Sequence, residues 1–224
     1  MATSLGIGGQ IVTDGLVLCL DAANKDSYPG SGTTWYDLSG NNRNATKGGS
    51  QSPTYPQFNS GGWFTFSGGV TADNYSRFDV ALPQMDAVSA EAIWRSTVSG
   101  GHVFRLSNSD LQIGPDGFTA GNNYNDIQVT PNPVYNDNKW YIGQLTFDGQ
   151  TLNAYLNGEF YGTESMPTPD ADGIQAGTLR IGTRDDAYFA HFVGDISLIK
   201  IYNRALTAAE IQQNYNATKS RFGL

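Results

Sequence analysis

The segment KWYIGQLTFDGQTLNAYLNGEFYGT, residues 139–163, decides the fold class of this chain of 224 residues. Asp148-Gly149 stands between two runs in which apolar and polar residues alternate, and this is the strongest short-range signal for a β-hairpin. Asn157-Gly158 supplies a second tight turn of the same kind. The segment therefore predicts three consecutive antiparallel strands arranged as a meander.

The same strand pattern continues on both sides of the meander. GWFTFSGG, YSRFDVALP, SAEAIWRSTVS, GHVFRLSN and DIQVTPNP lie before it, and TLRIGTRDDAYFAHFVGDISLIKIYNR follows it. Turn signals recur about every 8 to 12 residues, which is the spacing of an all-β sandwich or barrel. Glycine (27 residues) and aromatic residues (12%) are abundant, which suits short strands joined by tight turns. The sequence predicts a single all-β domain over residues 15–224.

One segment near the carboxyl end, TAAEIQQNYN, departs from the strand pattern. Thr207 is a natural N-cap, and Glu210 three residues later completes a capping box. Leu206 and Ile211 occupy the two positions of a hydrophobic staple. These signals predict one short amphipathic helix over about residues 207–216 that packs on the edge or rim of a sheet.

Charge and composition argue against several classes of function. The net charge is −8 and no cluster of Lys and Arg exists, so nucleic-acid binding through phosphate contacts is not expected. The amino-terminal residues lack the pattern of a secretory signal, and no apolar run reaches the ~20 residues that a membrane helix needs. Cys19, between Leu18 and Leu20, is predicted to be a core residue rather than a reactive thiol. Residues 1–14 show no sustained period and are expected to form an arm that orders against a partner.

Two motifs carry a resemblance to a known family. WYIGQLTFDGQTLNAYLNGEFYG is similar to the W-x-x-x-x-x-T-F-D-G...Y-x-N-G core of laminin G-like domains in the concanavalin A-like lectin/glucanase superfamily. LRIGTRDDAYFAHFVGDISLIKIYNRALTAAEI resembles the closing strand, turn and short helix of the same family. The resemblance covers most of residues 15–216 and implies an antiparallel β-sandwich, a concanavalin A-like jelly roll with one short carboxyl-terminal helix. It implies little about the ligand, because the family includes lectins, adhesins, hydrolases and structural modules.

A narrower resemblance concerns the two ends of the domain. DGLVLCLDAANKDSYPGSGTTWYDLSGNNRNAT and NYNATKSRFGL are similar to stand-alone laminin G-like proteins of tailed bacteriophages, particularly phages of marine cyanobacteria. This resemblance implies a non-enzymatic virion structural protein, synthesised in the host cytoplasm and displayed on the particle surface as a capsid decoration or fibre-associated module. Its expected partners are other virion proteins, bound through the arm, and assembly with them is expected to make it oligomeric.

Two alternatives to the virion role stay open, a carbohydrate-binding adhesin that recognises host surface glycan and a glycan hydrolase. Retaining glycosidases need two carboxyl groups about 5 Å apart. The four glutamates have no other acid within three residues, and they are Glu91, Glu159, Glu164 and Glu210. The histidines at positions 102 and 191 belong to no recognisable catalytic or metal motif. The sequence therefore predicts a protein that is not an enzyme.

Carbohydrate binding requires an aromatic ring that stacks on a sugar and polar groups that bind its hydroxyls. The loop AGNNYNDIQ provides Tyr124 framed by Asn122, Asn123 and Asp126. VYNDNKW, with Tyr135, is a second candidate loop. The alternative is that both are ordinary polar turns, in which Asn and Asp are common.

Calcium is the one cofactor that the sequence leaves open, and none is required. Laminin G-like domains often hold calcium at a sheet rim, and calcium prefers oxygen ligands. Asp37, Asp185 and Asp186 are the candidate ligands that this resemblance suggests. The alternative is that these carboxylates only stabilise turns.

Overall fold

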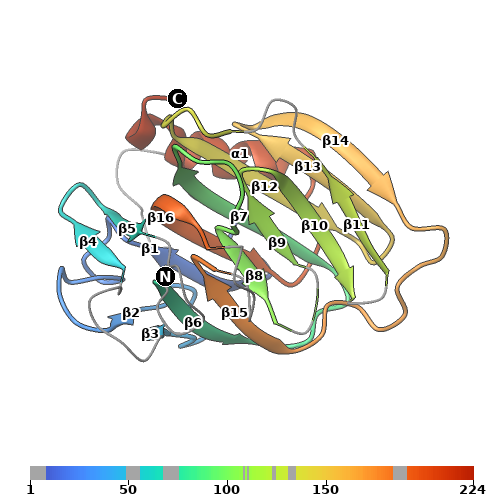
Figure 1. The fold of residues 1–224 in the computed structure, drawn as a ribbon. Helices are drawn as coiled ribbons and strands as arrows, with labels where there is room; N and C mark the ends of the chain where they lie inside the picture. Colours follow the sequence, from blue (N-terminus) through green and yellow to red (C-terminus); the bar gives the residue numbers. More distant parts are fainter. Residues whose placement is uncertain are drawn as a thin grey trace.

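The computed structural model describes residues 9–48, 56–67, 76–107, 109, 111–122, 125–130, 135–183 and 191–224. Over these residues the chain forms two antiparallel β-sheets that face each other, and a helix lies behind one of them (Figure 1). The predicted all-β sandwich with one short carboxyl-terminal helix is confirmed. In the described ranges, no helix has the length and apolar character needed to cross a membrane.

Sheet A is arranged around its longest strand, β16. Its strands in spatial order are β14 (Glu159–Ser165), β13 (Thr151–Leu156), β12 (Tyr141–Phe147), β7 (Val88–Arg95), β16 (Val193–Tyr202), β5 (Trp63–Ser67) and β4 (Gln57–Asn59). One edge of β16 pairs with β7, and the other edge is shared by β5 and β1 (Leu16–Asp21). Strands from the beginning, middle and end of the chain therefore meet at β16.

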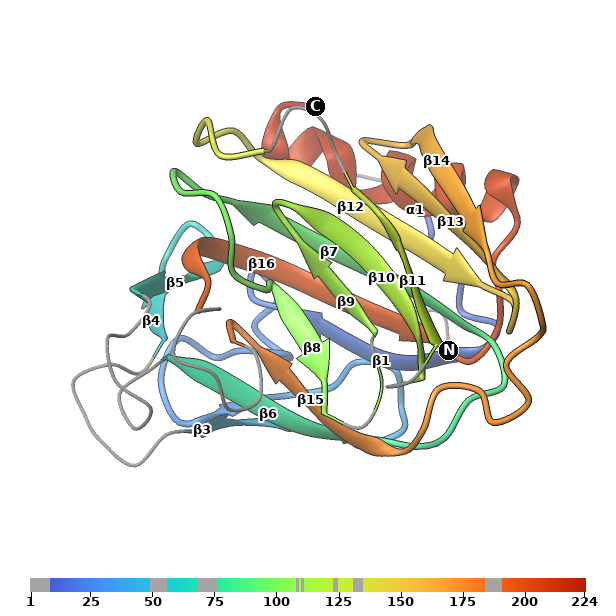
Figure 2. The same ribbon diagram turned by 45° about the vertical axis from the view of Figure 1, so that its right-hand side comes forward.

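Sheet B contains eight strands and lies in front of sheet A in Figure 2. Its strands in spatial order are β11 (Asn125–Val129), β10 (Gly117–Asn122), β9 (Gln112–Gly114), β8 (Phe104–Leu106), β15 (Gly177–Ile181), β6 (Arg77–Leu82), β3 (Ala45–Gly48) and β2 (Thr34–Trp35). β8 to β11 follow one another along the chain, whereas β15 is inserted between β8 and β6 from far later in the sequence.

The predicted meander is present as β12, β13 and β14 in sheet A. Asn157 and Gly158 have φ angles of 49° and 79°, so both lie in the left-handed region that a type I′ hairpin turn requires. In the preceding turn the Asp148 carboxylate accepts hydrogen bonds from the backbone amides of Gln150 and Thr151, at 2.9 and 2.7 Å. Turn chemistry that is readable in the sequence thus sets the register of three strands.

Aromatic side chains fill the space between the two sheets. Trp35 on β2, Phe64 on β5 and Phe78 on β6 are fully buried, with ring centroids 4.8 to 5.3 Å apart in tilted and edge-on arrangements. Burying each ring stabilises the fold by about 1.5–3 kcal/mol relative to exposure in water. This aromatic cluster joins sheet A to sheet B at the end of the sandwich where the chain begins.

Helix α1 (Ala208–Thr218) lies on the outward face of sheet A (Figure 2). The capping box is confirmed, because the Thr207 side chain accepts from the Glu210 amide while the Glu210 carboxylate accepts from the Thr207 amide. Leu206 and Ile211 share one buried cluster, as the staple predicts. The helix ends two residues later than predicted and continues as the 3₁₀ helix η1 (Lys219–Phe222).

The described part of the predicted arm, residues 9–14, lies against the domain itself rather than extending away from it. Ile11 and Val12 are buried. The Val12 amide donates to Asn214 Oδ1 at 2.9 Å, and the Tyr202 hydroxyl donates to the Val12 carbonyl at 3.1 Å. Two apolar side chains in an otherwise polar segment explain this position, because they remove apolar surface from water. Residues 1–8 lie outside the described part of the chain.

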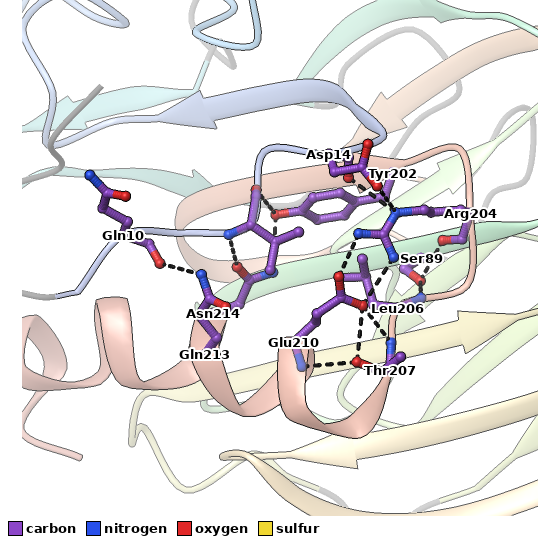
Figure 3. Close-up of polar contacts among 11 residues, drawn as sticks. Gln10, Asp14, Ser89, Tyr202, Arg204, Leu206, Thr207, Glu210, Gln213 and Asn214 are labelled. Carbon is purple, nitrogen blue, oxygen red and sulfur yellow. Dashed lines mark hydrogen bonds and ion pairs between the residues drawn. The ribbon is translucent and has the colours of Figure 1, made fainter. Parts of the chain in front are cut away.

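Figure 3 shows the polar contacts that fix this amino-terminal segment to α1. Gln213 donates to the Gln10 carbonyl at 2.8 Å. Arg204 lies between the two elements and pairs with Asp14 at 2.9 Å and with Glu210 at 2.6 Å. We call residues 10–14 the amino-terminal strap, since they run across the helix and the end of β16.

Candidate functional site

The outward face of sheet B carries a continuous row of polar residues, one from each of its eight strands. They lie directly opposite one another in register, in the order Thr34, Thr46, Asp79, Arg180, Arg105, Gln112, Thr119 and Gln128. At an inter-strand spacing of about 4.8 Å, the row is about 34 Å long. We call these eight residues the polar row.

Alternation along each strand places the polar row on the outward face. Asp79 stands between Phe78 and Val80, which are buried between the sheets. Arg180 stands between Leu179 and Ile181, which are also buried there. Because successive side chains of a strand point to opposite faces, the polar member of each strand points away from the core. The strand register then aligns these polar side chains in one row, since directly opposite residues of neighbouring strands point to the same face of the sheet.

Arg77 and Asp79 form an ion pair within the row's third strand, β6. Arg77 Nε lies 2.8 Å from Asp79 Oδ2, and both side chains are less than one third exposed. The pair rests on Gly48 of the neighbouring strand, where an added Cβ would overlap both Asp79 Oδ2 and Arg77 Nε. The absence of a side chain at Gly48 therefore lets the pair lie flat on the sheet.

The centre of the row contains polar atoms without a partner. Asp79 Oδ1 and the Nε and Nη1 atoms of Arg180 are buried and have no hydrogen-bond partner in the described part of the chain. Arg180 is half-buried, and its cross-strand neighbours are Asp79 on one side and Arg105 on the other. Unpaired buried polar groups are costly and rare in native proteins, so they mark positions where water or a ligand completes the hydrogen bonds.

In the other half of the row, two side chains bind each other. Gln112 Nε2 donates to Thr119 Oγ1 at 2.8 Å. The Gln128 side chain lies over Gly117, where a Cβ would overlap its Nε2 atom. Thr119 is 1% exposed while Gln128 is exposed, so the row is most enclosed towards its middle. Asp79 and Arg180 are thus the neighbouring residues of the row whose buried polar atoms could still form hydrogen bonds.

The chemistry at this centre is that of recognition. A carboxylate oxygen that can only accept stands beside guanidinium nitrogens that can only donate. A hydroxyl group does both, so a ligand with neighbouring hydroxyls can bind Asp79 Oδ1 and Arg180 together. The row itself contains no histidine, cysteine or second carboxylate that could act as a base or nucleophile.

The loop that the sequence proposed for sugar binding lies beside one end of the row. Asn123 and Tyr124 fall outside the described residues, as does the side chain of Asn122, the last residue of β10. Asp126 is exposed on β11, and its position two residues before Gln128 places it on the same outward face. Of this loop, the structure therefore brings Asp126 to the row.

Tyr135 lies elsewhere, at the opposite end of β10. Its amide donates to the Pro115 carbonyl, whereas Asp126 pairs with Gly121, and the length of β10, roughly 15 Å, lies between these points. Its ring is 4.6 Å from that of Tyr141. The two predicted sugar-binding loops therefore do not form one site.

Tyr135 belongs to a half-buried tyrosine cluster on the apolar core. Burial and a hydrogen bond with Tyr161 raise the pKa of Tyr135 to about 12. Burial, followed by a hydrogen bond to Asp137, raises the pKa of Tyr141 to about 12 as well. The rings of Tyr135 and Tyr141 pack against each other, and Tyr135 also packs against Tyr161. This is the geometry of a loop that packs on β12.

Of the candidate calcium ligands, only Asp37 lies in the described residues. Its carboxylate accepts hydrogen bonds from the backbone amides of Cys19, Ser39 and Arg43 at 2.9 to 3.0 Å. Asp185 and Asp186 fall outside them. Across the described ranges, no three or more His, Cys, Asp and Glu side chains are grouped as a metal site would need. Calcium binding stays a prediction.

Two of the four glutamates, Glu91 and Glu210, stabilise the fold. Lys200 binds Glu91 beneath α1 at 2.7 Å, and both side chains are at most 2% exposed. Glu210 belongs to the capping box, and its pairing with Arg204 lowers its pKa to about 2. Glu159 and Glu164 lie five positions apart on the edge strand β14, roughly 17 Å along an extended strand. None of these four positions forms the carboxyl pair of a retaining glycosidase.

Cys19 is a core residue, as predicted. It is 1% exposed, and burial raises the pKa of its thiol to about 12. His191 Nδ1 lies 2.8 Å from Thr183 Oγ1, and burial lowers the pKa of this histidine. Both groups are thus held in their neutral forms at pH 7, and neither lies in the polar row.

The sequence matches one family model, described as the concanavalin A-like lectin/glucanases superfamily, over residues 44–212. The match includes the meander, β16 and the first half of α1. It also includes seven of the eight strands that contribute to the polar row. No curated protein matches the chain in sequence.

Solved structures with a similar fold include binding domains of bacterial toxins. The binding domain of botulinum neurotoxin DC in complex with rat synaptotagmin II has 18% identity and a TM-score of 0.63, and the match covers 92% of this chain and 52% of that one. A botulinum neurotoxin type C structure, described by its interaction with two ganglioside molecules, has 17% identity, a TM-score of 0.63 and coverages of 91% and 51%.

The binding domain of Paraclostridial Mosquitocidal Protein 1 has 13% identity, a TM-score of 0.60 and coverages of 91% and 52%. This chain therefore spans about half the length of each of these structures. At these identities the likeness shows a shared fold.

Proposed function

Because this chain belongs to the concanavalin A-like lectin/glucanase superfamily, we propose that it is a non-enzymatic glycan-binding domain whose ligand lies on the polar row of sheet B. One observation carries the proposal. Asp79 Oδ1 and two nitrogens of Arg180 are buried, unpaired and next to each other in register. This favours the adhesin alternative of the sequence over the virion role as the primary activity.

Sugar hydroxyls match the groups that the row leaves unpaired. A pair of neighbouring hydroxyls donates to Asp79 Oδ1 and accepts from Arg180, and each such hydrogen bond to a charged group contributes about 1.5–3 kcal/mol. The row is about 34 Å long, enough for several sugar units of an extended chain. Binding domains of similar fold support this role, among them the botulinum neurotoxin DC domain in complex with SialylT.

The direct test is a glycan array probed with the wild-type chain, Asp79→Asn and Asp26→Asn. Asp26 is exposed in the turn that follows β1 of sheet A, and its substitution changes net charge equally. We expect Asp79→Asn to weaken every wild-type signal at least tenfold, since about 1.5 kcal/mol is lost with a charged hydrogen bond. An unchanged profile for Asp79→Asn, or a wild type that binds no glycan, would overturn the proposal.

Gly48→Ala provides a second variant that leaves all polar groups in place. The added methyl group would overlap Asp79 Oδ2 and Arg77 Nε, so the ion pair must move off the strand. We expect weaker glycan binding with the melting temperature little changed, because Gly48 is the last residue of β3, beyond the part of that strand that pairs with β2. Wild-type binding by this variant would show that the position of Asp79 does not matter.

We also propose that the domain is displayed on the surface of a phage particle. The strap runs along α1 behind sheet A, so the polar row faces the opposite way from residue 10. That arrangement suits attachment on one side and binding on the other. The chain should be found in fixed stoichiometry in purified particles, and deleting residues 2–8 should release it. Particles without the protein, or normal incorporation of the truncated chain, would contradict display or anchoring respectively.

A further inference from the structure

We infer that the glycan carries an oxyanion, as a carboxylate, sulfate or phosphate group, and that this group binds the guanidinium of Arg180. The inference rests on the proposed function and narrows its ligand class. Its basis is the electrostatic surroundings of Arg180 in the middle of the polar row. Acidic polysaccharides and acid-capped oligosaccharides are the ligands that combine hydroxyl groups with such an anion.

Other arginines of the chain show how its guanidinium groups are normally compensated. Arg95 binds Asp195 at 2.7 Å, Arg204 binds Glu210 at 2.6 Å, and Arg221 binds Asp21 at 2.7 Å. Each of these arginines is partly enclosed, and each has a carboxylate within hydrogen-bonding distance. In these three arginines, partial burial of the guanidinium thus goes together with an anionic partner.

In the described part of the chain, Arg43 and Arg180 both depart from that pattern, and Arg180 is the one that lies in the polar row. Its Nε and Nη1 atoms are buried and unpaired in the described part of the chain. Asp79 is its carboxylate neighbour in register, but Asp79 Oδ2 is already bound by Arg77 at 2.8 Å. On the other side lies Arg105, a like charge placed directly opposite. Like charges in directly opposite positions are unfavourable, so this arrangement attracts a negative group.

A neutral hydroxyl would satisfy the hydrogen bonds of Arg180 but not its charge. A half-buried charge whose carboxylate neighbour is already paired with another arginine stays unfavourable, because the low dielectric surroundings solvate it poorly. An oxyanion supplies both the acceptor and the counter-charge, and its hydrogen bonds to a guanidinium are about twice as strong as neutral ones. Arg180 therefore distinguishes an acidic glycan from a neutral one.

The test compares four soluble polymers by titration calorimetry: polygalacturonate for carboxylate, dextran sulfate for sulfate, a phosphorylated mannan for phosphate and dextran as the neutral probe. Each is titrated into the wild type, Arg180→Gln, Arg180→Lys and Lys25→Gln. Lys25 is exposed and serves as the matched control for one lost positive charge. Inorganic phosphate and sulfate are added as competitors, to separate a site for a free anion from a site for an acidic glycan.

We expect at least one acidic polymer to bind at least tenfold more tightly than dextran. Arg180→Gln should abolish that preference, Arg180→Lys should retain part of it, and Lys25→Gln should retain all of it. The preference should also shrink at roughly 0.3 M salt, where charges are screened over a few ångströms. This set of results supports the inference.

Other outcomes overturn it and remain distinguishable from failure of the proposed function. The inference is wrong if acidic and neutral polymers bind equally. It is also wrong if a folded Arg180→Gln variant keeps the full preference for acidic polymers. If Asp79→Asn still weakens binding in that case, the glycan-binding proposal holds without the anionic group. Full competition by inorganic phosphate or sulfate would mean a site for the free ion. Absence of binding to all four polymers and to the glycan array would overturn both proposals.

Discussion

The outward faces of the two sheets both carry polar residues aligned in register, but a helix covers these residues on one sheet only. On sheet A, Lys200, Glu91 and Gln144 lie opposite one another on β16, β7 and β12. Helix α1 covers them, and all three are at most 1% exposed. On sheet B, the polar row has no helix over it in the described part of the chain.

Covering a polar face requires that its groups satisfy one another. Lys200 binds Glu91 at 2.7 Å, and Gln144 Nε2 donates to Glu91 Oε2 at 2.9 Å and to the Ile211 carbonyl of α1 at 3.1 Å. The sheet B row leaves a carboxylate oxygen and two guanidinium nitrogens unpaired. Gln144 Oε1 on the covered face also lacks a partner, but the charged groups there are paired with each other. The comparison teaches that incompletely paired charge, rather than polarity, separates a binding face from a structural one.

The largest expected effect is on the covered face, from Lys200→Met. This change leaves the Glu91 carboxylate buried without its counter-charge, and breaking a buried ion pair in this way costs about 3–5 kcal/mol. Urea denaturation should show a loss of that size in the free energy of unfolding. The double variant Glu91→Leu/Lys200→Met removes both charges and should recover most of the loss. A single variant as stable as the wild type would mean that the pair is not buried under α1.

A smaller loss is expected from Asn214→Ala, which tests how the strap closes over the covered face. Asn214 is fully buried, accepts from the Val12 amide and donates to the Tyr202 hydroxyl at 3.0 Å. Leaving the Val12 amide unpaired costs about 1–3 kcal/mol. Hydrogen exchange at Val12 should accelerate together with this loss. Asn216→Ala on the exposed side of α1 is the matched control, and an equal effect there would contradict the strap contact.

Glu210→Gln is expected to cost about 0.5–1 kcal/mol at pH 7 through loss of the ion pair with Arg204, since a glutamine can still accept in the capping box. The effect depends on pH, because pairing with Arg204 lowers the folded pKa of Glu210 to about 2 from an ordinary value of 4.5. The stabilisation is therefore complete above pH 4.5 and disappears as the pH falls towards 2. Urea midpoints of wild type and variant should converge over that interval. A constant difference down to pH 2 would show that the carboxylate charge is not involved.

The smallest effect on stability is expected on the open face, from Arg180→Gln. No hydrogen bond or ion pair of Arg180 is lost in the described structure, and a like charge opposite Arg105 is removed. The free energy of unfolding should change by less than about 0.5 kcal/mol, or rise slightly. A loss above about 1 kcal/mol would show that Arg180 is structural, and the contrast between the two faces would no longer hold.

Local sequence signals predict the parts of this fold that depend on nearby residues. The turn at Asn157-Gly158 requires positive φ at both residues, and the capping box of Thr207 and Glu210 is a contact between residues three positions apart. Alternation in RFDVAL and TLRI also indicates that Asp79 and Arg180 point away from the core. Each of these features is decided within a few residues of the chain.

The polar row could not be predicted in the same way, because its members come from eight strands. Asp79 and Arg180 are about a hundred residues apart, and only the register of β6 with β15 brings them together. That register follows from long-range packing, which no single segment encodes. The packing of the strap against the domain could not be predicted for a related reason. Ile11 and Val12 show no period in sequence, and their burial depends on α1 and β16 at the other end of the chain.

The central position of β16 also sets the order in which the protein can fold. Without β16, sheet A is three separate pieces, namely β1, the β4–β5 hairpin, and the run of β7, β12, β13 and β14. All three are synthesised first, and their edges stay open until residues 193–202 arrive. Open strand edges are aggregation-prone, and such distant pairings slow folding. Completion of sheet A thus waits for β16, and α1 follows β16 directly along the chain and packs over it.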